Sequence, residues 1–508
     1  MKRQGIIKRH IVTILLLSFI LSISCGSDND TAETGSGSEA AVTTAVENTD
    51  GEIEFIADNL PELDYEGTEI NWLCGDYNDA YYDDIWAENL NGSLVNDSIF
   101  NARRAVEERL NITLNVERYQ FVWAELSEYN AMVKSIVLSG DSTYDALVGY
   151  TLVPLIIEGG YFMNLADNEY LELDMPWWNQ SANELMPDQG NIQFITGDAT
   201  LSLIKHSLCM FFNQDLLDSY QITENLYDVV RAGDWTLDYM ERLITDTYSD
   251  LNGNQQYDKD DRYGLTFGDT NKYRMLPAAM NVDMYTKTSD GYELTFIGER
   301  TNDVFTRLQE LVNNNVNVRV AASDQSNDEV IDSFGGNKTS SIFVSGNAIL
   351  SASLIGDAST ILENSTFTLG MIPFPKYDEN QDDYYTAAQR FAHIYIPATA
   401  EDSGRSGAVL EAWASECYRS VMPTYFETNL KTRYATDSDM AEMFDLLRAN
   451  LCVEFGTVFY SQLGLNCDTF KNLSNSSWNF ASETEKLRTS TEAQLEVLTA
   501  ALNSWQND

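Results

Sequence analysis

Thr68-Glu69-Ile70-Asn71-Trp72-Leu73 begins a series of alternating strand and helix patterns and itself predicts a β-strand. Between residues 95 and 110, apolar residues recur at helical spacing, after the cap-like residues Asn91 and Ser93. Residues 112–116 then alternate apolar and polar side chains, as half-buried strands do. This first stretch therefore predicts a strand, a helix and a second strand.

The same alternation continues for one more cycle. Apolar residues line one face of residues 126–136, and Gly140 follows as a helix stop. Asp145-Ala146-Leu147-Val148-Gly149 then predicts a short buried strand. A β-α-β-α-β order favours a mainly parallel sheet with helices on its faces.

A second α/β region is predicted after about residue 190. The 508 residues exceed what one ordinary core accommodates, so we expect at least two domains. The expected strands are 192–195, 208–212, 343–350, 367–372 and 394–396, and the expected helices are 235–247, 405–420 and 482–505.

The N-terminus has the pattern of a bacterial secretory signal. An apolar run over residues 11–23 is too short to span a bilayer comfortably. The basic residues before it are Lys2, Arg3, Lys8 and Arg9. We expect residues 1–24 to be removed as a signal peptide.

The segment Leu21-Ser22-Ile23-Ser24-Cys25-Gly26 resembles a lipobox. The resemblance implies that Cys25 is lipidated and becomes the first mature residue. Ser22 stands where the usual pattern has Leu, and Leu21 lies one position early. A plain secretory signal that is cleaved elsewhere is the alternative.

Residues 25–51 predict a lipidated cysteine followed by a disordered tether. They are rich in Gly, Ser, Thr, Ala and Glu and show no apolar period. No later segment holds the roughly 18 consecutive apolar residues of a membrane span. We therefore expect a folded part held just outside a membrane by its lipid.

The charge and the cysteine content narrow the possible classes of protein. The sequence has 31 Lys and Arg against 79 Asp and Glu, a formal charge of −48, which excludes binding to nucleic-acid phosphates. The cysteines after Cys25 are odd in number and irregularly spaced, so free thiols are favoured, with a Cys452–Cys467 bridge left open. They are Cys74, Cys209, Cys417, Cys452 and Cys467.

Six segments together resemble the extracellular solute-binding proteins of bacterial ABC importers, family 1, of the maltodextrin-binding type. Their order and spacing cover roughly residues 140–400. They are Gly140–Asp145, Gly160–Leu165, Phe211–Leu216, Gly233–Thr236, Phe343–Ala348 and Gly370–Pro375.

The resemblance implies an α/β fold of the periplasmic-binding-protein-like type II. Two α/β lobes would be joined by crossing strands around a ligand cleft. Lobe 1 would comprise residues 52–190 plus about 390–430, and lobe 2 residues 191–389 plus about 431–508. The implied protein is a monomer that captures a sugar or oligosaccharide and passes it to ABC permease subunits. It would work at the extracellular face of the membrane or in the periplasm.

Several side chains are candidates for the ligand cleft. An aromatic face suits the apolar C–H faces of sugars, and amides or charged groups suit the hydroxyls. Trp177 and Trp178 lie in Pro176-Trp177-Trp178-Asn179, and Tyr150 follows the strand ending at Gly149. The further candidates are Asp76, Trp235 and Arg390. Packing of both Trp rings between the lobes, and a structural ion pair for Arg390, are the alternatives.

A calcium-loop pattern occupies residues 250–261 and implies a structural Ca²⁺. Oxygen-bearing residues stand at loop positions 1, 3, 5, 7, 9 and 12, as hard-oxygen coordination of Ca²⁺ requires. They are Asp250, Asn252, Asn254, Gln256, Asp258 and Asp261. Gln255 replaces the usual Gly at position 6, and the final Asp makes the loop resemble the dockerin variant. A polar surface turn without metal is the alternative.

Enzyme motifs are sparse, so we expect a binding protein. The mature chain has only His206 and His393, and it contains neither His-Glu-x-x-His nor Gly-x-Ser-x-Gly. A secreted glycoside hydrolase remains an alternative because carboxylates are abundant. A peptide- or metal-binding lipoprotein is the third hypothesis.

Overall fold

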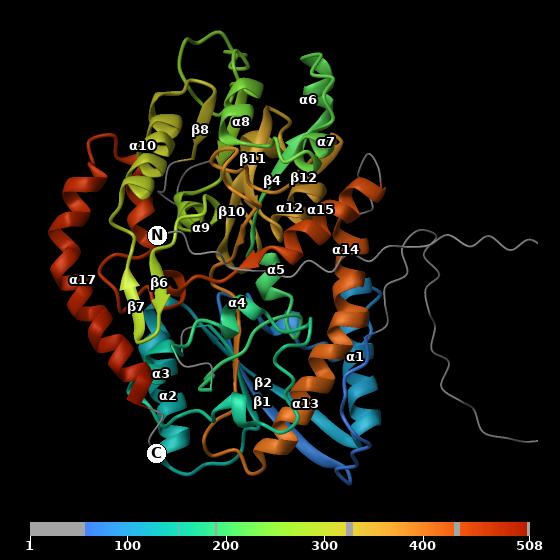
Figure 1. The fold of residues 1–508 in the computed structure, drawn as a ribbon. Helices are drawn as coiled ribbons and strands as arrows, with labels where there is room; N and C mark the ends of the chain where they lie inside the picture. Colours follow the sequence, from blue (N-terminus) through green and yellow to red (C-terminus); the bar gives the residue numbers. More distant parts are fainter. Residues whose placement is uncertain (1–55, 151, 188–189, 322–328, 431–436, 505–508) are drawn as a thin grey trace, which may run out of the picture. The chain divides into compact units, whose positions relative to one another are not determined.

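The computed structural model describes residues 56–150, 152–187, 190–321, 329–430 and 437–504 (Figure 1). The predictions for the signal peptide, for Cys25 and for the tether lie outside these residues. Across the described part of the chain, we find no helix with the length and apolar character needed to cross a bilayer.

The first sheet contains strands in the order β14-β3-β1-β2. These strands are β1 (Thr68–Tyr77), β2 (Ile112–Phe121), β3 (Ala146–Gly149) and β14 (His393–Tyr395). β1 pairs in parallel with β2 and β3, while β14 is antiparallel to β3. We call the part built on this sheet lobe 1. Its three parallel strands confirm the β-α-β-α-β prediction.

The second sheet has the order β12-β4-β11-β5-β8. These strands are β4 (Leu208–Asn213), β5 (Tyr263–Phe267), β8 (Val318–Val320), β11 (Ala348–Leu354) and β12 (Leu369–Ile372). β5 is parallel to both β8 and β11, whereas β4 runs antiparallel to β11 and β12. We call the part built on this sheet lobe 2.

Helices cover the two sheets (Figure 1). They are α1 (Leu94–Leu110), α2 (Leu126–Leu138), α3 (Val153–Glu158), α4 (Gln180–Asn183), α5 (Ser202–Lys205), α6 (Gln214–Ser219), α7 (Leu226–Arg231), α8 (Leu237–Leu243), α9 (Leu276–Ala279), α10 (Glu299–Asn314), α11 (Ser341–Val344), α12 (Asp357–Asn364), α13 (Ser403–Glu416), α14 (Met422–Leu430), α15 (Asp437–Ala449), α16 (Phe455–Val458) and α17 (Phe480–Asn503). Short 3-10 helices include η4 (Thr270–Met275) and η7 (Cys467–Ser474).

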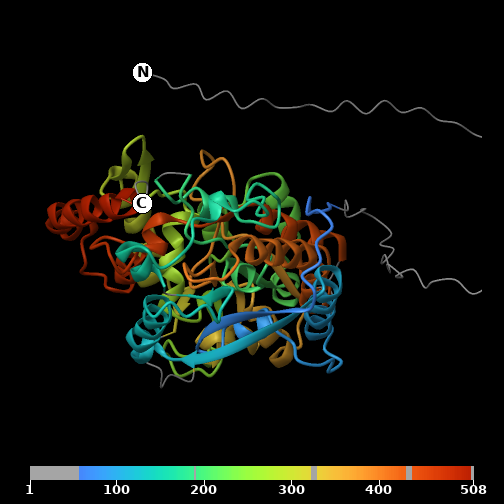
Figure 2. The same ribbon diagram turned by 90° about the horizontal axis from the view of Figure 1, so that it is seen from below.

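Small strand pairs complete the fold. β6 (Tyr285–Thr288) pairs with β7 (Gly291–Leu294), and β9 (Val330–Asp332) pairs with β10 (Lys338–Ser340). Figures 1 and 2 show α17 alongside the β6–β7 hairpin. α17 also packs against α10 and against α3, so it contacts elements of both lobes.

Crossing segments join the lobes side by side. The isolated bridges Ile195–Ile394 and Ser207–Ala388 pair the first crossing segment, which contains Ile195 and Ser207, with the second, which contains Ala388 and Ile394. β13 (Thr386–Ala387) pairs with β15 (Leu451–Cys452), which adds a third segment. Two lobes joined by such strands are the predicted architecture.

Two of the predicted strands are wrong in detail. Residues 192–195 form only the bridge at Ile195, because this crossing pairs through isolated contacts rather than a regular ladder. The strand predicted from Phe343 begins at Ala348 instead. Phe343 lies in α11, whose first turn is capped by the Ser340 side chain accepting from the Phe343 N–H.

The cysteines of the described residues are all free. Cys74, Cys209, Cys417 and Cys467 are buried, and Cys452 is half-buried. The Cys452–Cys467 bridge left open above is therefore not formed. Burial raises the pKa of the Cys74 thiol, as it does for the others, so these groups behave as small apolar residues.

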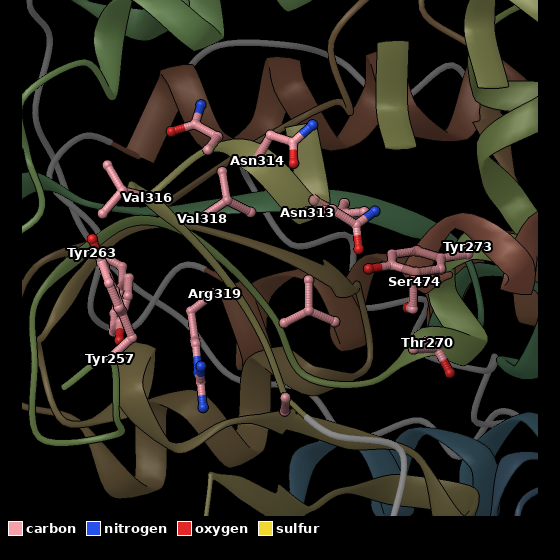
Figure 3. A pocket seen from close by; sticks show the side chains of 14 residues that line it. Tyr257, Tyr263, Thr270, Tyr273, Asn313, Asn314, Val316, Val318, Arg319 and Ser474 are labelled. Carbon is pink, nitrogen blue, oxygen red and sulfur yellow. The ribbon is translucent and has the colours of Figure 1, made fainter. Parts of the chain in front are cut away.

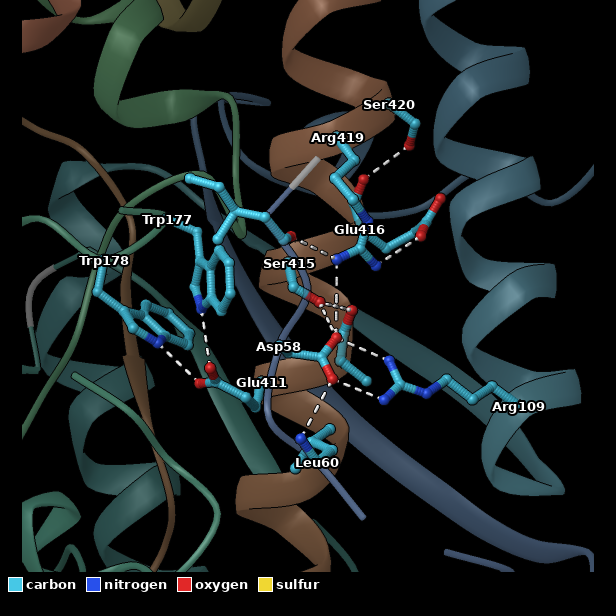
Figure 4. A network of polar contacts seen from close by, with 12 residues as sticks. Asp58, Leu60, Arg109, Trp177, Trp178, Glu411, Ser415, Glu416, Arg419 and Ser420 are labelled. Atoms are coloured by element: carbon cyan, nitrogen blue, oxygen red, sulfur yellow. Dashed lines mark hydrogen bonds and ion pairs between the residues drawn. The ribbon is translucent and has the colours of Figure 1, made fainter. Parts of the chain in front are cut away.

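Asp58 fastens the start of the described chain to lobe 1 (Figure 4). Its carboxylate accepts hydrogen bonds from both terminal nitrogens of Arg109, at 2.7 and 2.6 Å, and from the Ser415 hydroxyl at 2.7 Å. Burial opposes ionisation, but these donors outweigh it and lower the pKa of Asp58. Through Arg109 of α1 and Ser415 of α13, Asp58 therefore ties the start of the described chain to both helices.

Candidate functional site

Three aromatic side chains follow the carboxyl ends of the parallel strands of lobe 1. Tyr77 is the last residue of β1, Trp123 lies just beyond β2, and Tyr150 directly follows β3. The ring centroids of Tyr77 and Trp123 are 6.2 Å apart, and those of Tyr77 and Tyr150 are 6.3 Å apart. We call these three residues the strand-end cluster. In open α/β sheets, this edge is where ligands bind.

Exposure differs within the strand-end cluster. Tyr77 and Tyr150 are buried, whereas 52% of the Trp123 surface is exposed. An exposed indole is costly to hydrate and offers a flat apolar face. Trp123 is therefore the member of the cluster that is open to a ligand in this arrangement.

Lobe 2 places polar side chains next to the strand-end cluster. The Tyr150 side chain hydrogen-bonds that of Tyr460, and burial raises the pKa of Tyr150 well above its usual value. The Arg274 guanidinium lies 5.8 Å from the centre of the Tyr460 ring and pairs with Asp468. Lys471 lies 3.3 Å from the same carboxylate. Tyr460 is thus the lobe 2 residue that bonds the strand-end cluster, and behind it Arg274 of η4 pairs with Asp468 of η7.

Asp76 and Arg390 lie near this junction and organise its loops. The buried Asp76 carboxylate accepts the backbone N–H of Tyr81 at 2.8 Å and the Arg118 Nε–H at 2.6 Å. Arg390 donates to the Asn337 side chain, and its carbonyl accepts the Tyr81 hydroxyl at 2.7 Å. Both residues have protein partners, but the partner of the Arg390 side chain is a neutral amide rather than the carboxylate of an ion pair. Ligand-binding roles for Asp76 and Arg390 stay predictions.

Trp177 and Trp178 lie in the core of lobe 1 (Figure 4). They are 0% and 2% exposed, and their indole N–H groups donate to Glu411 at 3.0 and 2.9 Å. They also line a cavity of about 430 Å³ beside the Arg448–Asp198 ion pair, but present almost no ring surface to it. Their burial favours packing over ligand contact, but within lobe 1 rather than between the lobes, and a ligand-facing role for either stays a prediction.

Trp235 is fully buried in lobe 2. Its indole N–H donates to the Pro373 carbonyl at 2.9 Å, and its ring lies 5.8 Å from that of Tyr239. The structure does not bring it to the strand-end cluster.

A separate cavity of about 610 Å³ follows the edge strand β8 (Figure 3). Figure 3 shows Tyr257 and Tyr263 at one end and Tyr273, Thr270 and Ser474 at the other. The lining residues do not include the strand-end cluster. Because Tyr257 belongs to residues 250–261, the predicted calcium loop forms part of the wall of this cavity.

Three solved structures share this fold. An ABC substrate-binding protein from Listeria monocytogenes in complex with cycloalternan has 14% identity and a TM-score of 0.51, covering 86% of this chain and 98% of that chain. The galacto-N-biose/lacto-N-biose I-binding protein of a Bifidobacterium longum ABC transporter, in complex with lacto-N-biose, has 12% identity and a TM-score of 0.51, covering 85% and 98%. A cyclo/maltodextrin-binding protein complexed with maltotetraose has 8% identity and a TM-score of 0.50, covering 87% and 98%.

At these identities the likeness establishes the fold. No family model and no curated protein matches the chain. The described part of the chain has the two-lobed α/β fold of ABC-importer solute-binding proteins, which confirms the predicted fold class.

Sequence reasoning missed Tyr77, Trp123, Arg274 and Tyr460. The first two follow strand ends, which is a signal the sequence does carry. The strand patterns were ended too early, at Leu73 and Val116, whereas β1 and β2 continue to Tyr77 and Phe121. Arg274 and Tyr460 lie on short irregular segments that have no periodic signature.

Proposed function

We propose that the protein is an extracellular solute-binding protein that captures a carbohydrate between its two lobes and delivers it to an ABC importer. The observation that carries this proposal is the strand-end cluster facing Tyr460 and Arg274 across the lobe junction. The fold supports it, because hinged lobes of this kind close around a ligand.

The chemistry of the junction matches a sugar. The indole face of Trp123 suits an apolar C–H face, and the Tyr150 and Tyr460 hydroxyls suit the sugar hydroxyls. Arg274 and Lys471 both pair with Asp468, so each of these charges already has a protein partner and a neutral ligand suits the site. Burial in the closed arrangement would strengthen each hydrogen bond.

The ligands bound in the structural neighbours support the same ligand class. Cycloalternan, lacto-N-biose and maltotetraose are all carbohydrates. Their range of sizes does not select a single ligand for this chain. We therefore propose the carbohydrate class and a permease partner, with import rather than hydrolysis as the outcome.

Lipid anchoring completes the proposal. The lipobox-like segment places a cysteine at residue 25, and an acyl chain contributes about 0.8 kcal/mol per buried CH₂. Cys25→Ala should therefore move the protein from the membrane fraction to the soluble fraction. Retention of the variant in the membrane fraction would refute the anchor and leave the binding function intact.

Calorimetry with a panel of mono- and oligosaccharides tests the function. We expect saturable binding by at least one carbohydrate, and the same carbohydrate recovered intact after long incubation. Shortened products would instead identify a glycoside hydrolase. A panel without any binding would refute the carbohydrate class.

A further inference from the structure

The predicted calcium loop contains a buried carboxylate that lacks half of its hydrogen-bond partners. Asp261 is 0% exposed. Its Oδ2 accepts the Tyr248 hydroxyl at 3.0 Å and the Asp258 N–H at 3.3 Å. Its Oδ1 has no hydrogen-bond partner among the described residues. A buried anionic oxygen without a partner is costly, so the feature needs a cation or a donor to explain it.

The carboxylate lies beneath the loop rather than outside it. The Asp258 N–H that it accepts belongs to position 9 of the same loop. The loop is closed at its base by Ser249 and Arg262, whose backbone groups exchange hydrogen bonds of 3.0 and 2.9 Å. Tyr263 fastens it to β5, because its hydroxyl donates to the Asp258 carbonyl at 2.9 Å.

The loop backbone already has the curvature of a cation loop. Asp250, at position 1, accepts the N–H groups of Gly253 and Gln255 at 2.6 and 2.8 Å. Gln255 occupies position 6 with φ +62°, the left-handed conformation that glycine normally supplies there. Gln255 therefore adopts the backbone conformation that the loop pattern requires at position 6.

We propose that residues 250–261 bind one Ca²⁺, with the free oxygen of Asp261 as the buried ligand. The remaining ligands come from the side chains of Asp250, Asn252, Asn254 and Asp258 and from an oxygen of Gln256. Only three of these six residues are carboxylates. Within the described residues no three His, Cys, Asp or Glu side chains lie close enough together to hold a metal ion, so Asp250, Asp258 and Asp261 must approach one another when Ca²⁺ binds.

The consequence of binding is local and structural. Tyr257 stands at position 8 of the loop and stacks near Tyr248, with ring centroids 4.7 Å apart. It also lines the cavity beside β8 (Figure 3). Ca²⁺ would fix this wall of the cavity and the start of β5.

Thermal unfolding of the full mature chain with Ca²⁺ alone tests the proposal. Extracellular Ca²⁺ modules bind with Kd on the order of 10⁻⁴–10⁻³ M, so about 10 mM Ca²⁺ should nearly saturate the loop. The melting temperature should rise by about 2–4 °C, because a ligand of the folded state stabilises it by mass action. Mg²⁺ should have less effect, because it demands six closely placed ligands.

Two double variants separate this loop from general attraction to an acidic surface. Asp250→Ala/Asp258→Ala should abolish the shift. Asp382→Ala/Asp383→Ala removes the same charge from an exposed turn elsewhere and should retain it. An equal shift in the loop variant, or no shift in the wild type, overturns the proposal.

Terbium luminescence covers the case in which the loop variant does not fold. Excitation of Tyr257 and Tyr248 in the wild-type protein should sensitise bound Tb³⁺, and added Ca²⁺ should remove the signal. Asp261→Asn keeps the size of the side chain and should weaken Tb³⁺ binding at least tenfold. Unchanged Tb³⁺ binding in Asp261→Asn, or no sensitised emission from the wild type, contradicts the proposed ligand set.

Discussion

Lobe 1 holds two groups of aromatic side chains that differ in their spacing along the sequence and in their exposure to solvent. The Trp177–Trp178 doublet is adjacent in sequence, fully buried and hydrogen-bonded to Glu411. Tyr77, Trp123 and Tyr150 are far apart in sequence, yet meet at one edge of the sheet with one ring half exposed. The difference shows that aromatic residues adjacent in sequence can be wholly consumed by core packing, whereas residues far apart in sequence can meet at strand ends and leave one ring exposed.

The doublet is buried because the neighbouring crossing segment approaches it closely. Trp178 forms a β-bridge with Gly197. A Cβ atom at Gly197 would lie 2.0 Å from the Trp177 carbonyl oxygen, and Gly197 has φ +153°. Only glycine permits this approach, which presses the crossing segment onto the two indoles.

Trp177→Ala should have the largest effect of the changes considered, on stability. Removing a buried indole costs about 3–5 kcal/mol of unfolding free energy. Urea denaturation should show this loss, while calorimetry on the folded variant at low temperature should show carbohydrate affinity within about twofold of wild type. A large loss of affinity with unchanged stability would make the doublet a ligand site.

Glu411→Gln should reveal a pH-dependent cost in the same core. Burial raises the pKa of Glu411 to about 7, from a usual value of 4.5, although both indole N–H groups oppose this. The folded protein thus holds this proton more tightly than the unfolded chain, so the stability that Glu411 contributes is lost as pH rises from 4.5 to about 7. The wild type should lose up to about 3 kcal/mol relative to the variant across this range.

Chemical denaturation of both proteins at several pH values measures that difference. Glu454, whose pKa burial raises to about 8, titrates in both proteins and cancels in the comparison. A constant difference between wild type and Glu411→Gln from pH 4.5 to 7.5 would contradict the assigned protonation of the core.

Trp123→Ala should show the opposite behaviour to Trp177→Ala. An anchor ring contributes on the order of 2 kcal/mol to binding, about thirtyfold in affinity. Unfolding free energy should change by no more than about 0.5 kcal/mol, because half of the ring is exposed. Calorimetry and urea denaturation on the same sample give both quantities. Unaltered affinity would remove Trp123 from the site.

Tyr460→Phe should have the smallest effect. It removes the hydroxyl that meets Tyr150 across the lobe junction, a hydrogen bond with a net contribution of about 0.5–1.5 kcal/mol. Carbohydrate affinity should fall about threefold to tenfold if this contact accompanies ligand closure. An affinity equal to that of the wild type would mean that the contact does not belong to the liganded arrangement.

The sequence predicted the alternating elements of lobe 1 because their apolar periods are regular. The predicted strand ends at Val116 because Arg118 and Gln120 stand where the alternation requires apolar side chains, although pairing with β1 continues to Phe121. The helix α11 was missed because it is only four residues long, too short to show a helical period, and Ser345-Gly346-Asn347 separates it from β11.

The site was less predictable than the fold because its lobe 2 side depends on long-range packing. Arg274 and Asp468 are almost two hundred residues apart and meet only because η4 packs against η7. The calcium loop is the opposite case. Its proposed ligands lie within one short segment, so their spacing can be read from the sequence, whereas the burial of Asp261 is provided only by the fold.

Tryptophan fluorescence during carbohydrate titration tests the central claim most directly. The comparison uses the wild type, Trp123→Phe, Trp177→Phe and Trp178→Phe, each with the carbohydrate that calorimetry identifies. If the strand-end cluster is the binding surface, the ligand-induced change in emission is largely lost in Trp123→Phe and retained in the other two variants. A signal that survives in Trp123→Phe and disappears in Trp177→Phe or Trp178→Phe would contradict the account and place the ligand at the doublet.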